Sequence, residues 1–290
     1  MTHEKNATAI IVTYNSADVI TRCIERVLAA PEIAEVIVVD NCGVDDTCDI
    51  IRKHFPTVKV IENPKNEGFG RANNVGLGKV KTDYALLINP DAVLEKDTLT
   101  LLVEVATKYT DAAILAPALY DEQGVLHKSF KQNVFDREKD KADFILPEAD
   151  ICADFLSGAV WLCNMKHLRT IGFFDKNIFL YYEDDDLCLR VRKAGLGLVY
   201  VPQARAVHMM GASSGASNAK AEYFKQQHLI FSRLYIEEKY HGVAAAKKLA
   251  KKLNLEYAAK ASFYTLFFNK AKINRYRGRI AGVFEFGERK

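Results

Sequence analysis

The N-terminal third of the chain alternates short apolar runs with segments of helical periodicity, and this alternation constrains the fold more than any other feature. Apolar runs at residues 7–13, 35–40, 58–62 and 84–89 have the length of buried strands. The segments between them repeat apolar side chains at intervals of three and four residues, which is typical of helices. Strands that alternate with helices need crossover connections. The sequence therefore predicts an α/β fold with a mostly parallel central sheet and helices on both faces.

Polar residues follow all four predicted strands at their carboxyl ends. In a parallel sheet these ends meet at one edge, where such folds bind their ligands. The sequence therefore predicts a polar pocket that contains carboxylates at this edge. The residues concerned are Thr13, Tyr14 and Asn15, Asp40 and Asn41, Glu62 and Asn63, and Asn89, Pro90 and Asp91.

Several of these polar residues have more than one interpretation. Asp91 follows a stiff proline and could hold a divalent cation against a diphosphate, or it could cap a helix over the segment VLEKDTL. Asp40 with Asn41 could accept hydrogen bonds from a base or ribose, or could form an Asx turn. His208, at the end of a later predicted strand, could be a metal ligand or a structural histidine. The residues alone leave these alternatives open.

Four consecutive acids at residues 183–186 stand at the start of a predicted helix. With 100° per residue, Asp184 lies in the middle of the apolar face that the helix turns inward. Asp185 and Asp186 point away from that face, as acids in a first helical turn do, and Asp186 can pair with Arg190. Glu183 flanks the inward stripe. An inward carboxylate needs a partner or a chemical task, so Asp184 is the candidate catalytic residue of the four.

Other parts of the sequence exclude some classes of protein. No glycine-rich phosphate loop follows the first strand, which disfavours a Rossmann dehydrogenase and a P-loop nucleotidase. No apolar run approaches the roughly 20 residues of a membrane-spanning helix, and the N-terminus lacks the apolar core of a signal peptide. A cytoplasmic location is therefore expected. The polar segment 121–144 and the small-residue run 211–217 are expected to be loops over the site.

The C-terminal region differs from the rest in charge. Residues 216–290 carry 16 Lys and Arg against 6 Asp and Glu, which leaves 24 basic and 31 acidic residues in the remainder. These residues have the pattern of long amphipathic helices, so the chain is expected to divide into a catalytic domain, 1–215, and a basic helical region, 216–290. The basic region suits a peripheral contact with an anionic membrane, or packing on the body or in a homodimer. It lacks a nucleic-acid-binding motif, and no nucleic acid is expected as a partner.

Six motifs in a fixed order identify a family. The chain resembles the inverting GT-A glycosyltransferases of family 2, particularly their rhamnosyltransferase-like and galactofuranosyltransferase-like branch, and the resemblance covers residues 7–215. It implies a Rossmann-like GT-A catalytic domain with a C-terminal helical extension. The motifs are IIVTYNSADVI, VIVVDNCGVDDT, VIENPKNEGFGRANNVG, LLINPDAVLE, FLSGAVWLCNMKHLRTIGFFDKNIFLYYEDDDLCLRVRKAG and VYVPQARAVHMMGAS.

The resemblance also implies roles for individual residues. A nucleotide-diphospho-sugar would be held at its base, ribose and diphosphate by residues at the sheet edge. Asp91, in the position of the family's metal motif, would bind Mg²⁺ or Mn²⁺ together with His208. Asp184 would be the general base, with Glu183 as its helper, and Trp161 would border the acceptor. The residues implied in donor binding are Thr13, Tyr14, Asn15, Asp40, Asn41, Asn66, Gly68, Phe69, Arg71, Asn74 and Asn89.

By the same resemblance, the protein is expected to move a sugar from dTDP-rhamnose or a UDP-sugar to a hydroxyl group with inversion. The acceptor would be a glycan or a lipid-linked sugar of bacterial cell-surface polysaccharide synthesis, which would place the protein in the cytoplasm or on the inner face of the membrane. Two alternatives remain at this point. They are a nucleotide-sugar binding module that has lost its activity, and a nucleotidyltransferase.

Overall fold

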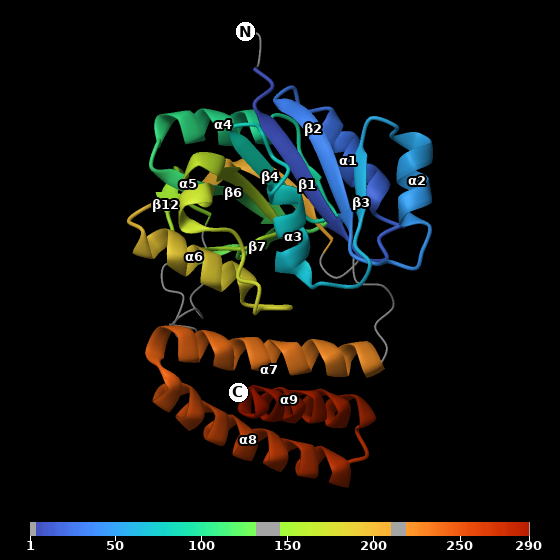
Figure 1. Ribbon diagram of the computed structural model, residues 1–290, viewed down its shortest axis with the longest axis vertical. Coiled ribbons are helices and arrows are strands. Elements are labelled where there is room, and N and C mark those ends of the chain that lie inside the picture. Colours follow the sequence, from blue (N-terminus) through green and yellow to red (C-terminus); the bar gives the residue numbers. More distant parts are fainter. Residues whose placement is uncertain (1–3, 132–145, 210–218, 290) are drawn as a thin grey trace. The chain divides into compact units, whose positions relative to one another are not determined.

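The computed structural model describes residues 4–131, 146–209 and 219–289. The chain divides into two compact units, Met1–Phe174 with Asp184–Gly215, and Asp175–Glu183 with Ala216–Lys290. The first unit is a sheet covered by helices and the second consists mainly of long helices (Figure 1). This is the α/β fold class predicted from the sequence, with its C-terminal helical extension. The predicted loop 211–217 and residues 132–144 of the predicted loop 121–144 lie outside the described residues.

A ten-stranded, mostly parallel sheet forms the centre of the first unit. Its spatial order is β3-β2-β1-β4-β11-β6-β12-β5, with β7 beside β6 and β9 beside β12. Strands β11 and β5 run antiparallel to their neighbours, while β1 to β4, β6 and β12 share one direction. The strands are β1 Ala7–Thr13, β2 Ile33–Asp40, β3 Lys59–Glu62, β4 Tyr84–Ile88, β5 Ala92–Leu94, β6 Ala112–Tyr120, β7 Leu126–His127, β9 Ile151–Cys152, β11 Val160–Asn164 and β12 Gly197–His208. A separate pair joins β8 Phe130–Lys131 to β10 Phe155–Leu156.

Helices cover both faces of the sheet because its strands are apolar on both sides. Along β1, Ala9 and Ile11 point into the core with α1, α2 and α4, whereas Ile10 points into the opposite core with α3, α5 and α6. All three side chains are fully buried. The helices are α1 Ile20–Leu28, α2 Thr47–His54, α3 Phe69–Leu77, α4 Thr98–Lys108, α5 Met165–Ile171 and α6 Glu183–Lys193.

The second unit packs three helices around a small apolar core of its own. These helices are α7 Ala219–His241, α8 Val243–Leu266 and α9 Lys270–Glu288. Ile230 and Leu234 of α7 meet Leu253 and Tyr257 of α8 in this core. Helix α9 approaches the backbone of α7 closely at Gly278 and Gly282, where any Cβ atom would collide with a carbonyl oxygen of α7. Among the described residues, no helix combines the length and apolarity needed to cross a membrane.

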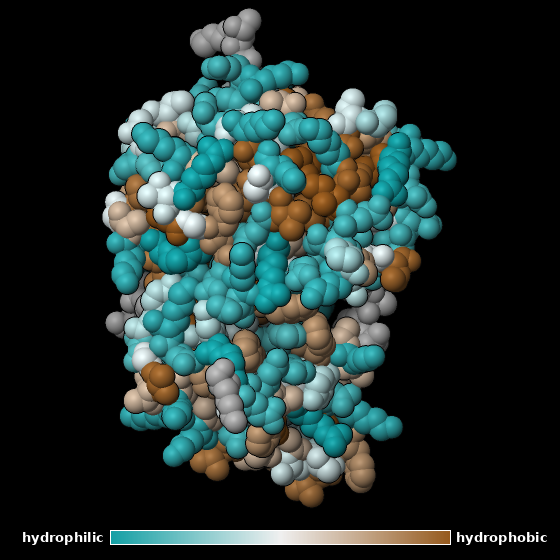
Figure 2. All heavy atoms as spheres, viewed as in Figure 1, coloured by the Kyte–Doolittle hydropathy of each residue, from teal (hydrophilic) through white to brown (hydrophobic). Residues whose placement is uncertain are grey.

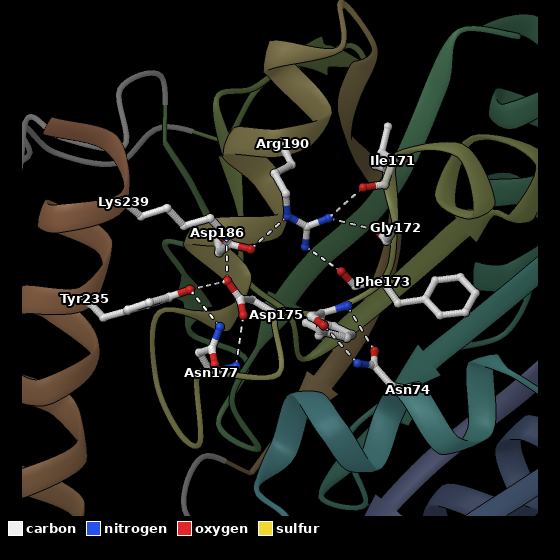
Figure 3. Close-up of polar contacts among 11 residues, drawn as sticks. Asn74, Ile171, Gly172, Phe173, Asp175, Asn177, Asp186, Arg190, Tyr235 and Lys239 are labelled. Carbon is white, nitrogen blue, oxygen red and sulfur yellow. Dashed lines mark hydrogen bonds and ion pairs between the residues drawn. The ribbon is translucent and has the colours of Figure 1, made fainter. Parts of the chain in front are cut away.

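The segment Asp175–Glu183 belongs to the second unit, although it lies within the range predicted for the catalytic domain. Its first residue accounts for this placement. The Asp175 carboxylate accepts hydrogen bonds from the Tyr235 hydroxyl at 2.8 Å and from the Lys239 ammonium at 2.6 Å, both on α7 (Figure 3). These bonds lower the pKa of Asp175 against the opposing effect of its burial. The chain therefore leaves the first unit after Phe174 and re-enters it at Asp184.

Candidate active site at the carboxyl edge of the sheet

The predicted strand ends meet at one edge of the sheet. Thr13 is opposite Asp40 in the ladder of β1 and β2, and Asp40 is opposite Glu62 in the ladder of β2 and β3. Backbone hydrogen bonds continue past the strands, from the Asn41 N–H to the Thr13 carbonyl and from the Asn63 N–H to the Asp40 carbonyl, each 2.8 Å. The polar segments after the strands are therefore held at one edge, as the sequence predicts.

Asp40 is engaged by hydrogen bonds within the protein, although not in the Asx turn that the sequence left as an alternative, because its backbone partner Gly43 lies three residues on. One of its carboxylate oxygens accepts from the Thr13 hydroxyl at 2.9 Å, and the other accepts from the Gly43 N–H at 2.9 Å. The side chain is buried. Asn15, in a left-handed conformation with φ 57°, accepts from the Val44 N–H at 2.7 Å. These bonds fix the two loops relative to each other and leave the Tyr14 side chain between them exposed.

Asn41 organises the loop that precedes α3. Its amide donates to the Asn66 carbonyl oxygen Oδ1 at 2.9 Å and to the Gly68 backbone carbonyl at 3.3 Å. Its own Oδ1 accepts from the Asn63 amide at 3.1 Å and from the Glu67 N–H at 3.0 Å. Asn41 and Asn66 thus shape the predicted donor-binding loop through bonds within the protein.

The predicted donor residues of α3 have different surroundings. Phe69 lies at the start of the helix with its ring 6.2 Å from that of Phe174, and Arg71 pairs with Glu67 at 3.3 Å. The structure gives Asn74 another role than donor binding. Its amide donates to the Phe174 carbonyl and accepts from the Phe174 N–H, both at 2.9 Å, so both ends of the side chain are engaged (Figure 3).

The metal-binding residues implied by the resemblance come together at the end of β4. Strand β5 pairs antiparallel with the end of β12 and places Ala92 opposite His208. The His208 Nε2 atom lies 3.3 Å from Asp91 Oδ1 and 3.4 Å from the Asn89 amide nitrogen. The alternative in which Asp91 caps a helix is wrong, because residues 92–94 form β5 and α4 begins only at Thr98.

The chemistry of this cluster suits a divalent cation. Asp91 is almost completely buried, and the Asn89 Oδ1 atom beside it is buried with no hydrogen-bond partner in the part of the chain that the structure describes. Carboxylate and amide oxygens are ligands of Mg²⁺ and Mn²⁺, and the imidazole nitrogen suits Mn²⁺ better than Mg²⁺. No set of three His, Cys, Asp or Glu residues forms a metal site within the described ranges, so the donor or water would complete the coordination. Burial and the Asp91 carboxylate raise the pKa of the neighbouring Cys23 thiol, which therefore stays protonated.

Asp184 is seated in the first turn of α6 against the backbone of the loop before β11. Its Oδ2 atom accepts a 2.9 Å hydrogen bond from the Gly158 N–H. Its Oδ1 atom is buried and has no hydrogen-bond partner among the described residues. Burial raises the pKa of Asp184 to about 7, the Gly158 hydrogen bond lowers it in part, and the charge of Asp185 raises it further. The inward orientation predicted from the helical pattern is present.

The prediction that Asp185 and Asp186 point away from the core is wrong. Both side chains are buried, and Asp186 is 0 % exposed. Its predicted partner is correct, since the Arg190 Nε atom donates to Asp186 Oδ2 at 2.8 Å. The side of α6 that carries Asp186 and Arg190 is covered by the segment 171–173. Arg190 donates to the carbonyls of these three residues at 3.1, 2.8 and 2.6 Å (Figure 3).

The structure does not support the expected contact between Trp161 and an acceptor. Trp161 lies in β11 with 0 % exposure, and its ring stacks on that of Phe174 at 6.1 Å between centroids. No part of the indole reaches the surface. The apolar face of the sheet accounts for this, because neighbouring residues of β11 alternate between two buried cores.

The β4–β11 pairing connects the two parts of the site. The Asn89 N–H donates to the Ala159 carbonyl at 2.9 Å, directly after Gly158. The backbone that holds Asp184 is therefore bonded to the segment that carries Asp91. Sequence reasoning missed Gly158 and the positioning role of Arg190. The signal for Gly158 was a glycine two residues before β11, whose first four residues are apolar.

Residues 8–171, more than half of the chain, match the sequence model described as Glycosyl transferase family 2. The chain belongs to this family. The family that its motifs indicate is thereby confirmed, and the protein is a glycosyltransferase.

Two curated relatives of this family 2 chain are rhamnosyltransferases. It is 25 % identical over 245 residues to N-acetylglucosaminyl-diphospho-decaprenol L-rhamnosyltransferase of Mycobacterium tuberculosis, with 72 % of this chain and 78 % of the relative covered. It is 28 % identical over 222 residues to rhamnosyltransferase WbbL of Escherichia coli, with 69 % and 81 % covered. These relatives agree with the predicted rhamnosyltransferase-like branch.

Solved structures confirm the GT-A fold of the family 2 chain. The mannosyltransferase PcManGT from Pyrobaculum calidifontis, determined in complex with GDP-Man and Mn²⁺, matches with a TM-score of 0.58 at 16 % identity. The match covers 99 % of this chain and 88 % of the mannosyltransferase. At this identity the likeness concerns the fold.

Proposed function

We propose that this family 2 glycosyltransferase moves a sugar from a nucleotide-diphospho-sugar to a hydroxyl group with inversion at the anomeric carbon. The observation that carries the proposal is the seating of Asp184, a carboxylate with a pKa of about 7 held by the Gly158 N–H. Through the Asn89–Ala159 hydrogen bond, this seat is attached to the Asp91–His208 cluster. A general base and a diphosphate site are the two parts that such a transfer requires.

Asp184 acts as the general base in this proposal. Its carboxylate accepts the proton of the acceptor hydroxyl while that oxygen attacks the anomeric carbon and the bond to the diphosphate breaks. A single base and a single displacement invert the configuration. A pKa near 7 matches the requirement that a base be ionised at neutral pH and still accept a proton readily. The Gly158 N–H keeps one carboxylate oxygen fixed and so orients the base.

Asp91 and His208 are the proposed protein ligands of Mg²⁺ or Mn²⁺, with Asn89 beside them. The cation would neutralise charge that develops on the leaving diphosphate. The carboxyl group of Asp91 is buried at the sheet edge, and the pairing of β5 with β12 positions the His208 imidazole against it. The loops of Tyr14–Asn15 and residues 63–68, ordered by Asp40 and Asn41, form the remaining wall for the nucleotide.

The identities of donor and acceptor are proposed from the relatives. The first-choice donor is dTDP-rhamnose, followed by UDP-sugars, since the two curated relatives are rhamnosyltransferases. The proposed acceptor is a lipid-linked sugar or a glycan in polysaccharide synthesis, because one relative is named for a diphospho-decaprenol acceptor. We propose that residues 1–215 hold the catalytic machinery and that the region 216–290 brings it to the inner face of a membrane or joins two copies.

The decisive experiment compares the wild-type protein with Asp184→Asn. A panel of nucleotide sugars with Mn²⁺ is first screened by thermal shift, because a specific donor stabilises the folded state. The variant is expected to keep the donor-induced shift and to lose sugar transfer by a factor of at least about 10³. Turnover near the wild-type rate would rule out Asp184 as the base. Release of pyrophosphate in place of nucleoside diphosphate would indicate a nucleotidyltransferase.

A further inference from the structure

The turn between α8 and α9 exposes a cluster of large apolar side chains. Leu266, the last residue of α8, is 76 % exposed, and Phe268 in the turn is 88 % exposed. Phe263 and Phe267 are more than half exposed and lie 4.8 Å apart between ring centroids. Scattered apolar residues are normal on a surface, but four within six residues form a contiguous patch that water solvates poorly.

Helix α8 carries large apolar side chains outside the side that faces its core. Leu253 and Tyr257 face the core that α8 shares with α7 and α9. At 100° per residue, Leu255 and Leu266 fall on the other side of the helix and Phe263 falls on its flank, and all three are exposed. The outer apolar side contributes nothing to the core of the second unit. The packing of the three helices therefore does not explain why large apolar residues lie on the outer side of α8.

The residues around this apolar cluster are strongly basic. Residues 247–279 contain ten Lys and Arg and a single acid, Glu256. Lys260, Lys270 and Lys272 flank the cluster and are exposed. Figure 2 shows apolar side chains in brown among hydrophilic ones along the lower edge of the view, over α8. Exposed aromatic and leucine side chains flanked by lysines are complementary to a bilayer surface, in which anionic headgroups cover an apolar layer of acyl chains.

We propose that the α8–α9 turn and the outer side of α8 dock on an anionic phospholipid surface. Phe263, Leu266, Phe267 and Phe268 enter the boundary between headgroups and acyl chains, while the flanking lysines pair with headgroup phosphates. A nucleic acid offers phosphates without an apolar layer, and a second copy of this basic chain would bring like charges together. The docking itself does not depend on the proposed function. Only its role, which is to bring the enzyme to a lipid-linked acceptor, rests on that function.

Vesicle flotation of the full chain tests this surface. Vesicles contain phosphatidylglycerol mixed with phosphatidylcholine, or phosphatidylcholine alone. Wild-type protein is expected to float with the anionic vesicles at least about tenfold more than with the neutral ones. Phe267→Ser with Phe268→Ser, and separately Lys270→Glu with Lys272→Glu, are each expected to reduce this binding about tenfold or more. Phe284→Ser is the matched control, because Phe284 is 60 % exposed but lies about 24 Å from Phe268 along α9.

The outcomes separate this inference from the proposed function. Release of nucleoside diphosphate from the donor, measured without vesicles, should be the same in all these variants, since none of the substituted residues belongs to the active site. Equal binding to both vesicle types, or unchanged binding in both double variants, would overturn the inference and leave the glycosyltransferase activity standing. The inference would also be overturned if the wild-type protein is a dimer that binds no vesicles and the double phenylalanine variant is a monomer. Absence of donor turnover alongside intact vesicle binding would overturn only the proposed function.

Discussion

The carboxylate of Asp184 rests on the backbone of Gly158, whose N–H donates a 2.9 Å hydrogen bond to Oδ2. The contact is tight. A Cβ atom at residue 158 would lie 2.5 Å from Asp184 Oδ1 and 2.8 Å from its carboxyl carbon. The Asp184 carboxylate, which we propose as the base, is therefore positioned by a backbone group that only a glycine can present at this distance.

Gly158→Ala is expected to displace the Asp184 carboxylate, because the added methyl group occupies the space of its oxygens. Displacement of a base by about 1 Å is expected to lower kcat on the order of 10²-fold while donor affinity changes little. The folded state should lose about 1–3 kcal/mol from overpacking. Steady-state kinetics and denaturant unfolding measure the two effects. Gly287→Ala is the control, since its Cβ would meet no atom within 4 Å, and a similar loss of kcat there would refute the explanation.

The pH dependence of transfer should report the ionisation of Asp184. Burial raises the pKa of this carboxyl to about 7, and a base must be deprotonated to act. Below pH 7, kcat/KM is expected to fall about tenfold per pH unit, whereas a carboxylate of ordinary pKa near 4 would show no decline in this range. A profile measured from pH 5 to pH 9 that stays flat down to pH 5 would contradict the assignment.

Asp184→Asn should stabilise the fold at neutral pH. The pKa of Asp184 is raised in the folded protein, so between the unfolded value near 4 and about 7 the folded state binds more protons than the unfolded state. The contribution of this group to stability is greatest below pH 4 and is lost as the pH rises to 7. The variant should therefore gain on the order of 1 kcal/mol or more over wild type at pH 8 and almost nothing at pH 4. Thermal midpoints at both pH values measure this difference.

Helical geometry was sufficient to predict that Asp184 faces inward, because the apolar stripe of α6 and the acid belong to one short segment. The same geometry failed for Asp186. Its side of the helix is covered by the segment 171–173 through Arg190, and a contact between separate segments leaves no mark on the periodicity of either one. Trp161 shows the same limit, since both faces of β11 are covered by segments distant in the sequence, among them Phe174, which stacks on the indole ring.

The strand ends were predictable because crossover topology brings them to one edge whatever the strand order. The local structure after Asp91 was not predictable. The segment at residues 92–94 is short enough to be the start of a helix or a strand, and its pairing with the distant β12 decides between them. That same pairing places His208 beside Asp91, so the interpretation of both residues depended on one long-range contact.

Arg190→Met should destabilise the first unit strongly. The substitution leaves the buried Asp186 carboxylate without its guanidinium partner and removes the donors to the carbonyls of residues 171–173. Removal of one partner from a buried pair costs about 3–5 kcal/mol. Arg192→Met is the matched control on the same helix, because Arg192 pairs with Asp154 at the surface and should contribute at most about 1 kcal/mol. Similar denaturant midpoints for the two variants would show that the Asp186–Arg190 pair is not a buried support.

Cation binding should depend on Asp91 and His208 together. Binding of Mn²⁺ to the full chain in the presence of a nucleoside diphosphate is measured from the loss of the electron paramagnetic resonance signal of free Mn²⁺. This measurement does not depend on catalytic turnover. His208→Ala and Asp91→Ala each remove one of the two side chains that lie 3.3 Å apart, so each should weaken Mn²⁺ binding on the order of tenfold or more. His54→Ala, at an exposed histidine of α2, should leave binding unchanged. If both site variants bind Mn²⁺ as wild type does, the cation is held elsewhere and the Asp91–His208 contact serves only to fasten β5 to β12.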